Sequence, residues 1–286
     1  IDFKEIEKIR EYDIPFITRY ILEKKFKPLV WYDIDGNVLN NSLEFGGIDR
    51  IFDCEVIKVE KIKDTQQLSY KPRILSYDIE TDEFEIGKGH ILMISLVGEN
   101  FKKGLTWKKK LVKDNLICCK NEAEMLETFV NEVKKYDPDI LVGYFSDGFD
   151  LPYLRARAEK NSMKLNLGID DSQPVFSRGR LTTGKIKGIV HIDLFRFIKI
   201  VYAQYLQSET LSLNEVASEL LGEKKIVWEH KHSSKVADNE WENYYEYNLQ
   251  DALLTYKLTE KLWSDLLEFT NIIQEPLFDI SRDSMS

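Results

Sequence analysis

Two acidic side chains, Asp78 and Glu80, stand two positions apart in the segment RILSYDIETD. The residues before them are typical of a buried strand, in which side chains two positions apart point to the same face, with Cα atoms roughly 6.5–7 Å apart. Two carboxylates on one face repel each other, and burial adds a desolvation cost, so the pair predicts a raised pKa or a bound cation. If the strand ends before Asp78, both acids lie in solvent instead.

A third acid, Asp150, ends the segment GYFSDGFD, which follows the apolar residues 140–142. That run is typical of a buried strand, and a helix is expected to begin at Asp150 itself. Ligands of open α/β sheets gather at the carboxyl ends of strands, so Asp150 is a candidate for the same site as Asp78 and Glu80. An acid in the first turn also stabilises its own helix, which leaves a purely structural role open.

A tyrosine and a fourth acid, Tyr247 and Asp251, lie four positions apart in the segment YNLQD of a predicted helix. Residues with this spacing share one helical face, so the phenol and the carboxylate are expected to lie side by side. A surface pair is the alternative. The two residues become candidates for a site only together with the three acids that precede them in the chain.

The elements that must position these residues follow from the hydrophobic pattern after residue 71. Expected are strands over 73–80, 90–98 and 104–109, a helix over 121–139, a strand over 140–144, a helix over 150–160, a hairpin and a strand over 178–195, and helices over 211–222 and 240–269. The first three strands are predicted to form a meander. The alternation of strand and helix that follows indicates an α/β sheet with helices on its faces.

Residues 1–70 differ from this pattern and form a first, strand-rich unit. A short amphipathic helix is predicted near 15–25, and Asp35-Gly36 between two strand-like runs predicts a hairpin turn. Residues 52–63 alternate between apolar and polar side chains, which predicts a half-buried strand.

The composition narrows the class of protein. The chain has 286 residues and a net charge of −9, which argues against a protein that covers nucleic acid with a general basic surface. Its three cysteines fit neither a disulfide framework nor a zinc motif, which indicates a reducing compartment, and no apolar run is long enough to cross a membrane. The chain begins at Ile1 without a signal sequence, so we expect a trimmed piece of a longer protein.

The ordered acids and the tyrosine resemble the exonuclease motifs of family B DNA polymerases, in the tyrosine-containing branch of the DEDD group of 3′–5′ exonucleases. The segment DPDILVGYFSDGFDLPYLRARAEK is similar to the second-motif region nearly throughout. Residues 10–25 resemble the segment that precedes the exonuclease domain in archaeal members, and residues 277–286 resemble the start of the polymerase palm. The resemblance covers nearly the whole chain, most weakly at residues 26–70.

The resemblance implies an α/β fold, a ribonuclease H-like exonuclease domain whose mixed central sheet is flanked by helices, with a partial, strand-rich N-terminal domain. It implies the partial N-terminal domain at 1–70, the exonuclease domain at 71–265 and the start of a connection to the palm at 266–286. The Asp-x-x-Ser-Leu-Tyr-Pro and Asp-Thr-Asp motifs of the family's polymerase site are absent from the sequence, so DNA synthesis is not expected of this chain.

For function, the resemblance implies a metal-dependent 3′–5′ exonuclease that proofreads by removing nucleotides from single-stranded or frayed DNA ends. Asp78, Glu80, Asp150 and Asp251 are the implied ligands of two divalent cations, Mg²⁺ or Mn²⁺, with Asp78 bridging both ions. Tyr247 is implied to orient the attacking water. Carboxylate oxygens are hard ligands that suit these ions, and bound cations reverse the local field for an anionic substrate.

The implied partners are a single-stranded DNA 3′ end or a primer-template and, in the longer protein, the polymerase palm, fingers and thumb with a sliding clamp. The implied location is the cytoplasm of a prokaryote or archaeon, in association with the nucleoid and not with a membrane.

The sequence departs from the family's second motif at two positions. Phe145 stands where an asparagine usually begins the motif, and Gly148 replaces a second common asparagine. A polar contact near the scissile end is then missing, which predicts slow editing, although Phe145 offers a stacking face to a terminal base. Phe149 is expected to pack beneath the site and to touch a base only secondarily.

Other interpretations stay open at this stage. Phe145 keeps open the alternative of a decayed editing domain or a non-catalytic DNA-binding or uracil-sensing module. The polymerase-like flanks argue against a free-standing RNA nuclease. Pro15, Phe16 and Arg19 fall where archaeal relatives build part of a uracil-sensing pocket, with core packing and a surface arginine as the alternative. Residues 177–188 resemble the family's strand-separating hairpin, and an ordinary exposed hairpin fits equally.

Overall fold

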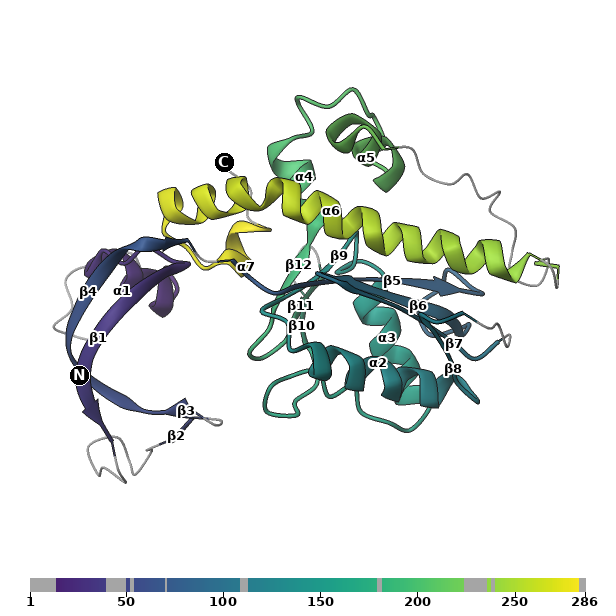
Figure 1. Ribbon diagram of the computed structural model, residues 1–286, viewed down its shortest axis with the longest axis horizontal. Coiled ribbons are helices and arrows are strands. Elements are labelled where there is room, and N and C mark those ends of the chain that lie inside the picture. The colour runs from purple at the N-terminus through teal and green to yellow at the C-terminus, as the bar shows by residue number, and fades with distance from the viewer. Residues whose placement is uncertain are drawn as a thin grey trace, which may run out of the picture.

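The computed structural model describes residues 14–39, 50–51, 54–69, 71–108, 113–178, 182–223, 236–237 and 240–282. A six-stranded sheet with the order β12-β9-β5-β6-β7-β8 forms its centre (Figure 1). The strands of this sheet are β5 (Ile74–Thr81), β6 (Ile91–Gly98), β7 (Phe101–Thr106), β8 (Leu116–Cys118), β9 (Ile140–Gly143) and β12 (Val190–Asp193). The β5-β6-β7 meander is antiparallel, whereas β9 pairs parallel with β5 and β12, and β8 pairs parallel with β7. The predicted meander and mixed α/β sheet are confirmed.

Helices cover both faces of this sheet because its central strands are apolar on both sides. All residues of β6 are buried, which is the pattern of a strand between two layers. α2 (Glu122–Tyr136) and α3 (Asp150–Lys160) cover one face, and α6 (Trp241–Ile273) runs across the other (Figure 1). The neighbours Leu75 and Ile74 on β5 accordingly belong to two different core clusters.

Local signals end two of the helices within the ranges predicted for them. Asn121 caps the start of α2 with its side chain, and Asp137 ends that helix in the left-handed conformation. Gly222 ends α5 (Leu213–Leu221) in the same way. The remaining elements around the sheet are the predicted hairpin of β10 (Val175–Arg178) and β11 (Thr182–Lys185), followed by α4 (Leu194–Val201) and, after α6, α7 (Leu277–Ile280).

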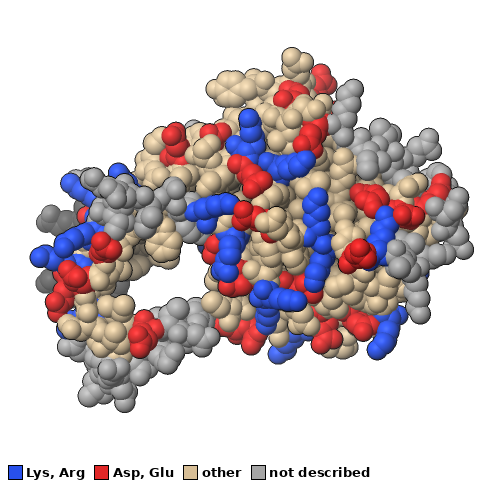
Figure 2. Space-filling view, in the orientation of Figure 1, with Lys and Arg blue, Asp and Glu red and all other residues tan. Residues whose placement is uncertain are grey.

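The N-terminal part is a helix and a strand-rich ribbon that lie to one side of the sheet (Figure 1). Its elements are α1 (Phe16–Lys24), β1 (Val30–Val38), β2 (Arg50–Ile51), β3 (Cys54–Glu55) and β4 (Ile57–Ser69). The helix predicted near 15–25 is confirmed as α1. Figure 2 shows an opening between this part and the body that holds the sheet.

The predicted turn at Asp35-Gly36 is wrong. β1 continues through both residues and pairs antiparallel with β4, with a register irregularity between Asp35 and Gly36. A Cβ atom at position 36 would lie 2.5 Å from the carbonyl oxygen of Lys58, so the glycine permits a close approach of two strands and does not form a turn.

The strand predicted at 52–63 forms in part as β4, but its burial does not alternate at period two. Val56 and Ile62 are half-buried, whereas positions 57–61 are exposed whether they are apolar or polar. A two-stranded ribbon buries a face only against a further layer, so the alternating sequence does not produce alternating burial here.

The long helix α6 crosses the boundary expected between residues 265 and 266 without interruption. After it, Leu277 and Ile280 of α7 are buried, and Leu277 packs in the same core cluster as Ile74. Among the helices that the structure describes, none combines the length and the apolar character that a membrane span requires.

Candidate active site

Three of the four predicted acids meet at one point of the fold. Asp78 and Glu80 project from the end of β5, Asp251 projects from α6, and one carboxylate oxygen of each lies within 4.8 Å of the other two. The expectation that Asp78 and Glu80 share a face is therefore confirmed. Three hard oxygen ligands at this separation are suited to a divalent cation such as Mg²⁺ or Mn²⁺.

Asp150 is buried at the first position of α3, as its sequence position predicted, but it is not one of the three acids within 4.8 Å. Burial, followed by the negative charges of Asp193 and Glu80, raises the pKa of Asp150 to about 8. The backbone of Ile79, between the two acids of β5, acts in the opposite direction. The hydroxyl of Tyr153, in the first turn of α3, donates to the carbonyl oxygen of Glu83 just after β5 at 3.0 Å, so the start of α3 lies beside the end of β5. A cation bound there would favour the ionised form of Asp150.

Tyr247 shares the Asp251 face of α6, as the spacing of four residues predicted. Its side chain is 5% exposed, and burial followed by the charges of Asp251, Glu80 and Asp78 raises the pKa of its phenol. A phenol with a raised pKa stays protonated near neutral pH, so Tyr247 acts there as a hydrogen-bond donor and acceptor and not as a base.

Two further residues of α6 bind the acids of β5, and the sequence interpretation missed both. The hydroxyl of Tyr244 donates to Glu80 Oε2 at 2.8 Å, and the amide Nδ2 of Asn248 donates to Asp78 Oδ2 at 2.7 Å. Ser95 Oγ of β6 in turn donates to Asn248 Oδ1 at 2.5 Å. Positions 244, 247, 248 and 251 have the i, i+3, i+4, i+7 spacing of one helical face, which is the signal that identifies them.

We expect Tyr244→Phe to weaken Mn²⁺ binding by about tenfold, because residues that hold metal ligands typically contribute tenfold or more to affinity. The substitution removes the hydrogen bond to Glu80 and keeps the ring. Tyr245→Phe is the matched control, since the Tyr245 hydroxyl contacts the carbonyl oxygen of Asn115 at 3.5 Å instead of an acid of the site. Calorimetric titration with Mn²⁺ measures both variants, and equal affinities for the two would contradict the assigned role of Tyr244.

The two phenylalanines of the β9–α3 loop differ in their surroundings. Phe145 has a left-handed backbone, with φ of 61°, and its side chain is 50% exposed. Its ring lies edge-on to Phe195, with the ring centroids 5.4 Å apart. Phe149 is half-buried and packs on Tyr153 at the core. An exposed ring at Phe145 remains accessible to a base.

The two departures from the second motif are coupled by sterics. A Cβ atom at Gly148 would lie 2.6 Å from the ring of Phe145. The ring therefore occupies the space that a side chain at position 148 needs. With the Phe145 ring in this position, residue 148 must be as small as glycine.

The three candidate uracil-pocket residues lie at the start of α1. Pro15 immediately precedes the helix, and the Phe16 side chain is 82% exposed with its ring near Tyr20. Arg19 is half-buried. Core packing of Phe16, the alternative considered from the sequence, is wrong, because its ring faces solvent.

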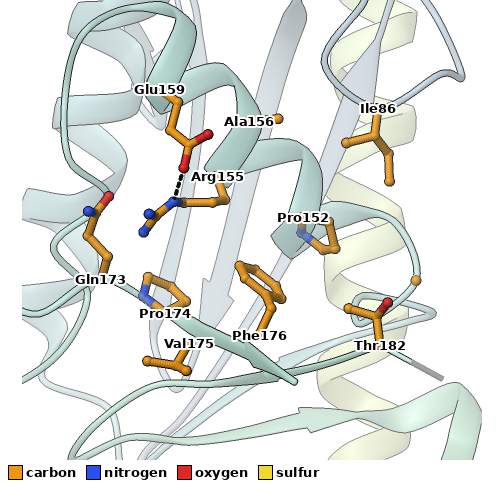
Figure 3. Close-up of a pocket in the computed structure, with 11 residues that line it drawn as sticks. Ile86, Pro152, Arg155, Ala156, Glu159, Gln173, Pro174, Val175, Phe176 and Thr182 are labelled. Carbon is orange, nitrogen blue, oxygen red and sulfur yellow. Dashed lines mark hydrogen bonds and ion pairs between the residues drawn. The ribbon is translucent and has the colours of Figure 1, made fainter. Parts of the chain in front are cut away.

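A pocket of about 680 Å³ opens beside the β9–α3 loop, between α3 and β10 (Figure 3). Gly148 and Pro152 line it, together with the ion pair of Arg155 and Glu159 on the exposed side of α3. None of the four acids lines this pocket. It flanks the candidate active site and does not contain it.

Comparison with known proteins identifies what the chain is similar to. Residues 7–216 match the family model described as DNA polymerase family B, exonuclease domain. Over 96% of its length the chain is 31% identical to a DNA polymerase of Pyrococcus glycovorans, and over the same share it is 31% identical to one of Thermococcus litoralis. It spans 31% and 14% of those two relatives, less than a third of their length.

A solved structure shows the same fold. The family B DNA polymerase from Pyrobaculum calidifontis superposes with a TM-score of 0.79 and 19% sequence identity. The likeness covers 98% of this chain and 35% of that structure. In that polymerase, the same mixed sheet and helices form one part of a larger chain.

Proposed function

Because the chain belongs to the exonuclease domains of the family B DNA polymerases, we propose that it is a metal-dependent 3′–5′ exonuclease. Its substrate is the 3′ end of single-stranded or frayed DNA. The observation that supports this proposal most is the convergence of Asp78, Glu80 and Asp251 from β5 and α6, with Asp150 at the adjoining helix start.

The residues of the site have different roles in the proposed phosphodiester hydrolysis. Asp78, Glu80, Asp150 and Asp251 would hold the metal, and the all-carboxylate donor set fits Mg²⁺ or Mn²⁺. Two such cations, when bound, supply a nucleophilic hydroxide and neutralise charge on the phosphate and the leaving 3′ oxygen. Tyr247 keeps its proton and orients the attacking water through its hydroxyl. Asn248 and Tyr244 fix the acids of β5 and limit their motion.

The wider biological setting is part of the same proposal. We propose that the chain proofreads a primer-template within a longer polymerase with palm, fingers, thumb and sliding clamp, in the cytoplasm of an archaeon or other prokaryote. The division into 1–70, 71–265 and 266–286 belongs to this proposal. The residues Pro15, Phe16 and Arg19 are then the remnant of a uracil pocket, and the β10–β11 hairpin helps to separate strands.

Single-stranded DNA labelled at its 5′ end is expected to shorten progressively with Mg²⁺ or Mn²⁺, whereas a 3′ label should leave at the first cut. Perfectly paired duplex should resist until its end frays, because opening costs about 1.4 kcal/mol per base-pair step, roughly tenfold in the accessible population. Denaturing gels of both labels measure the polarity.

Two controls complete this assay. Chelator should stop the reaction, and a circular single strand should stay intact because it has no end. Cutting of the circle would overturn the exonuclease assignment. Binding of DNA without any cutting in either metal would instead favour the non-catalytic module or decayed editing domain, the alternative that the exposed Phe145 supports.

A further inference from the structure

One buried arginine, Arg282, connects the segment after α7 to the loop between β9 and α3. The guanidinium of Arg282 is 5% exposed and donates from Nε to Asp147 Oδ2 at 2.8 Å. Its Nη1 donates to the carbonyl oxygens of His191 at 2.9 Å and Phe278 at 3.1 Å. An ion pair at this depth is formed by residues 135 positions apart, so it links the C-terminal segment directly to the loop between β9 and α3.

Asp147 is the acceptor in that loop, and it is fully buried. Although burial acts to raise its pKa, hydrogen bonds from His191 and Arg282 hold the pKa of Asp147 well below its usual value. Its second oxygen, Oδ1, accepts the Gly184 amide of β11 at 2.9 Å. Asp147 therefore joins three parts of the chain: the loop, the hairpin and the C-terminal segment.

Asp193 and His191 of β12 also bind residues of the same loop. Asp193, at the end of β12, accepts the amides of Phe145 at 2.9 Å and Asp147 at 3.1 Å. Ser146 is within hydrogen-bond distance of His191, at 3.0 Å. α3 begins directly after this loop, and its first residue is Asp150.

We propose that Arg282 is a positioning residue which, through Asp147, fixes residues 144–149 and thereby sets the place of Asp150 beside Asp78 and Glu80. This inference rests on the proposed metal-dependent function. The planar guanidinium bonds the carboxylate and two carbonyl oxygens at once, which the single ammonium of a lysine does not reproduce. Without Arg282, Asp147 Oδ1 retains the Gly184 amide and His191, but Oδ2 keeps only the more distant Arg196, at 3.4 Å, and the loop loses its tie to the C-terminal segment.

A purely structural role for Arg282, attachment of α7 to the body, is the competing explanation. Leu277→Ala tests that role separately, because Leu277 is a buried core contact of the same segment and forms no part of the polar network. Arg282→Met removes the charge and the hydrogen bonds while keeping an apolar chain. Arg282→Lys is the conservative variant. All four proteins are compared at temperatures equally far below their own melting temperatures.

The first measurement is amide hydrogen exchange of residues 144–150 in the metal-free full chain. Arg282→Met is expected to increase exchange in this loop, whereas Leu277→Ala leaves it at the wild-type rate. The second is calorimetric titration with Mn²⁺, in which Arg282→Met should weaken binding by about tenfold and Arg282→Lys should recover part of the loss.

Wild-type loop exchange and wild-type Mn²⁺ affinity in Arg282→Met would overturn the inference, even if that variant melts earlier. The same result for Arg282→Met and Leu277→Ala in both measurements would overturn it as well, in favour of attachment alone. Equal Mn²⁺ affinity of wild type and Asp78→Asn would count against the proposed metal site instead, and loop exchange would still decide whether Arg282 fixes the loop.

Discussion

The double substitution Asp78→Asn with Glu80→Gln is expected to reduce exonuclease cleavage by at least about 100-fold, the upper end of the losses seen when residues that merely support metal ligands are removed. Both acids lie within 4.8 Å of Asp251 through their ligand oxygens. Neutral amides of the same shape keep the packing but remove two negative charges from the metal site. Single-turnover cleavage at saturating DNA measures the loss.

The same substitutions are expected to stabilise the metal-free protein. Three carboxylates at this separation repel one another, and removing two charges should raise the free energy of unfolding by about 1–2 kcal/mol once solvent screening of the half-buried pair is included. The amides are preferable to alanines, because their oxygens still accept the hydrogen bonds from Asn248 and Tyr244. With alanines, two buried donors would lose their acceptors, at about 1–3 kcal/mol each.

Thermal unfolding with chelator and with Mn²⁺ distinguishes the relief of charge repulsion from the loss of metal binding. Wild type should gain stability from Mn²⁺, and the double variant should gain much less. Glu85→Gln is the matched control, since Glu85 is an exposed acid whose ion partner is Lys88. Unchanged cleavage in the double variant, or a lower melting temperature in chelator, would contradict the placement of the metal at these acids.

Most of the sheet could be predicted from the sequence because its longer strands carry their own local signals. The three-residue strand β8 was not predicted, because so short a run has too little pattern of its own. The apolar run of β9 and the capped ends of α2 are readable without knowledge of any partner. The turn predicted at Asp35-Gly36 is wrong because a distant segment decides the structure there. The dipeptide is a local turn signal, but Gly36 pairs with β4, whose Lys58 lies 22 positions further along the chain.

The residues of the site likewise fall into those that local periodicity predicts and those that depend on contacts between distant segments. Period two in a strand predicted that Asp78 and Glu80 share a face, and the helical period predicted the same for Tyr247 and Asp251. The same helical period also indicates Tyr244, but only knowledge that α6 faces β5 gives that residue a role. The contact of Asp147 with Arg282 has no sequence signal at all, because it depends on how two distant segments pack.

Gly148→Asn is expected to lower the free energy of unfolding by about 0.5–1.5 kcal/mol, the value of the ring contact that the half-exposed Phe145 side chain loses when it moves aside. The new Cβ would lie 2.6 Å from the Phe145 ring, which would have to leave its edge-on contact with Phe195. Phe145→Asn alone should be nearly neutral. It relieves about 1–2 kcal/mol of left-handed backbone strain and loses about 0.5–1.5 kcal/mol of ring contact.

The double variant Phe145→Asn with Gly148→Asn should therefore regain most of the stability that Gly148→Asn loses. Urea unfolding of wild type, both single variants and the double variant gives the coupling energy directly. Simple addition of the two single effects would show that the ring does not occupy the space over Gly148.

The same cycle decides what Phe145 does for catalysis. A ring that stacks on a terminal base stabilises ground state and transition state alike, whereas an asparagine that contacts the substrate near the reacting phosphate favours the chemical step. Phe145→Asn is therefore expected to raise the single-turnover rate at saturating DNA and to weaken DNA binding modestly. Rates over a range of enzyme concentrations, with Mg²⁺ and with Mn²⁺, separate the two effects. If the saturated rate stays the same or falls, Phe145 is not a defect of the site, and the decayed-domain alternative loses the residue that supports it.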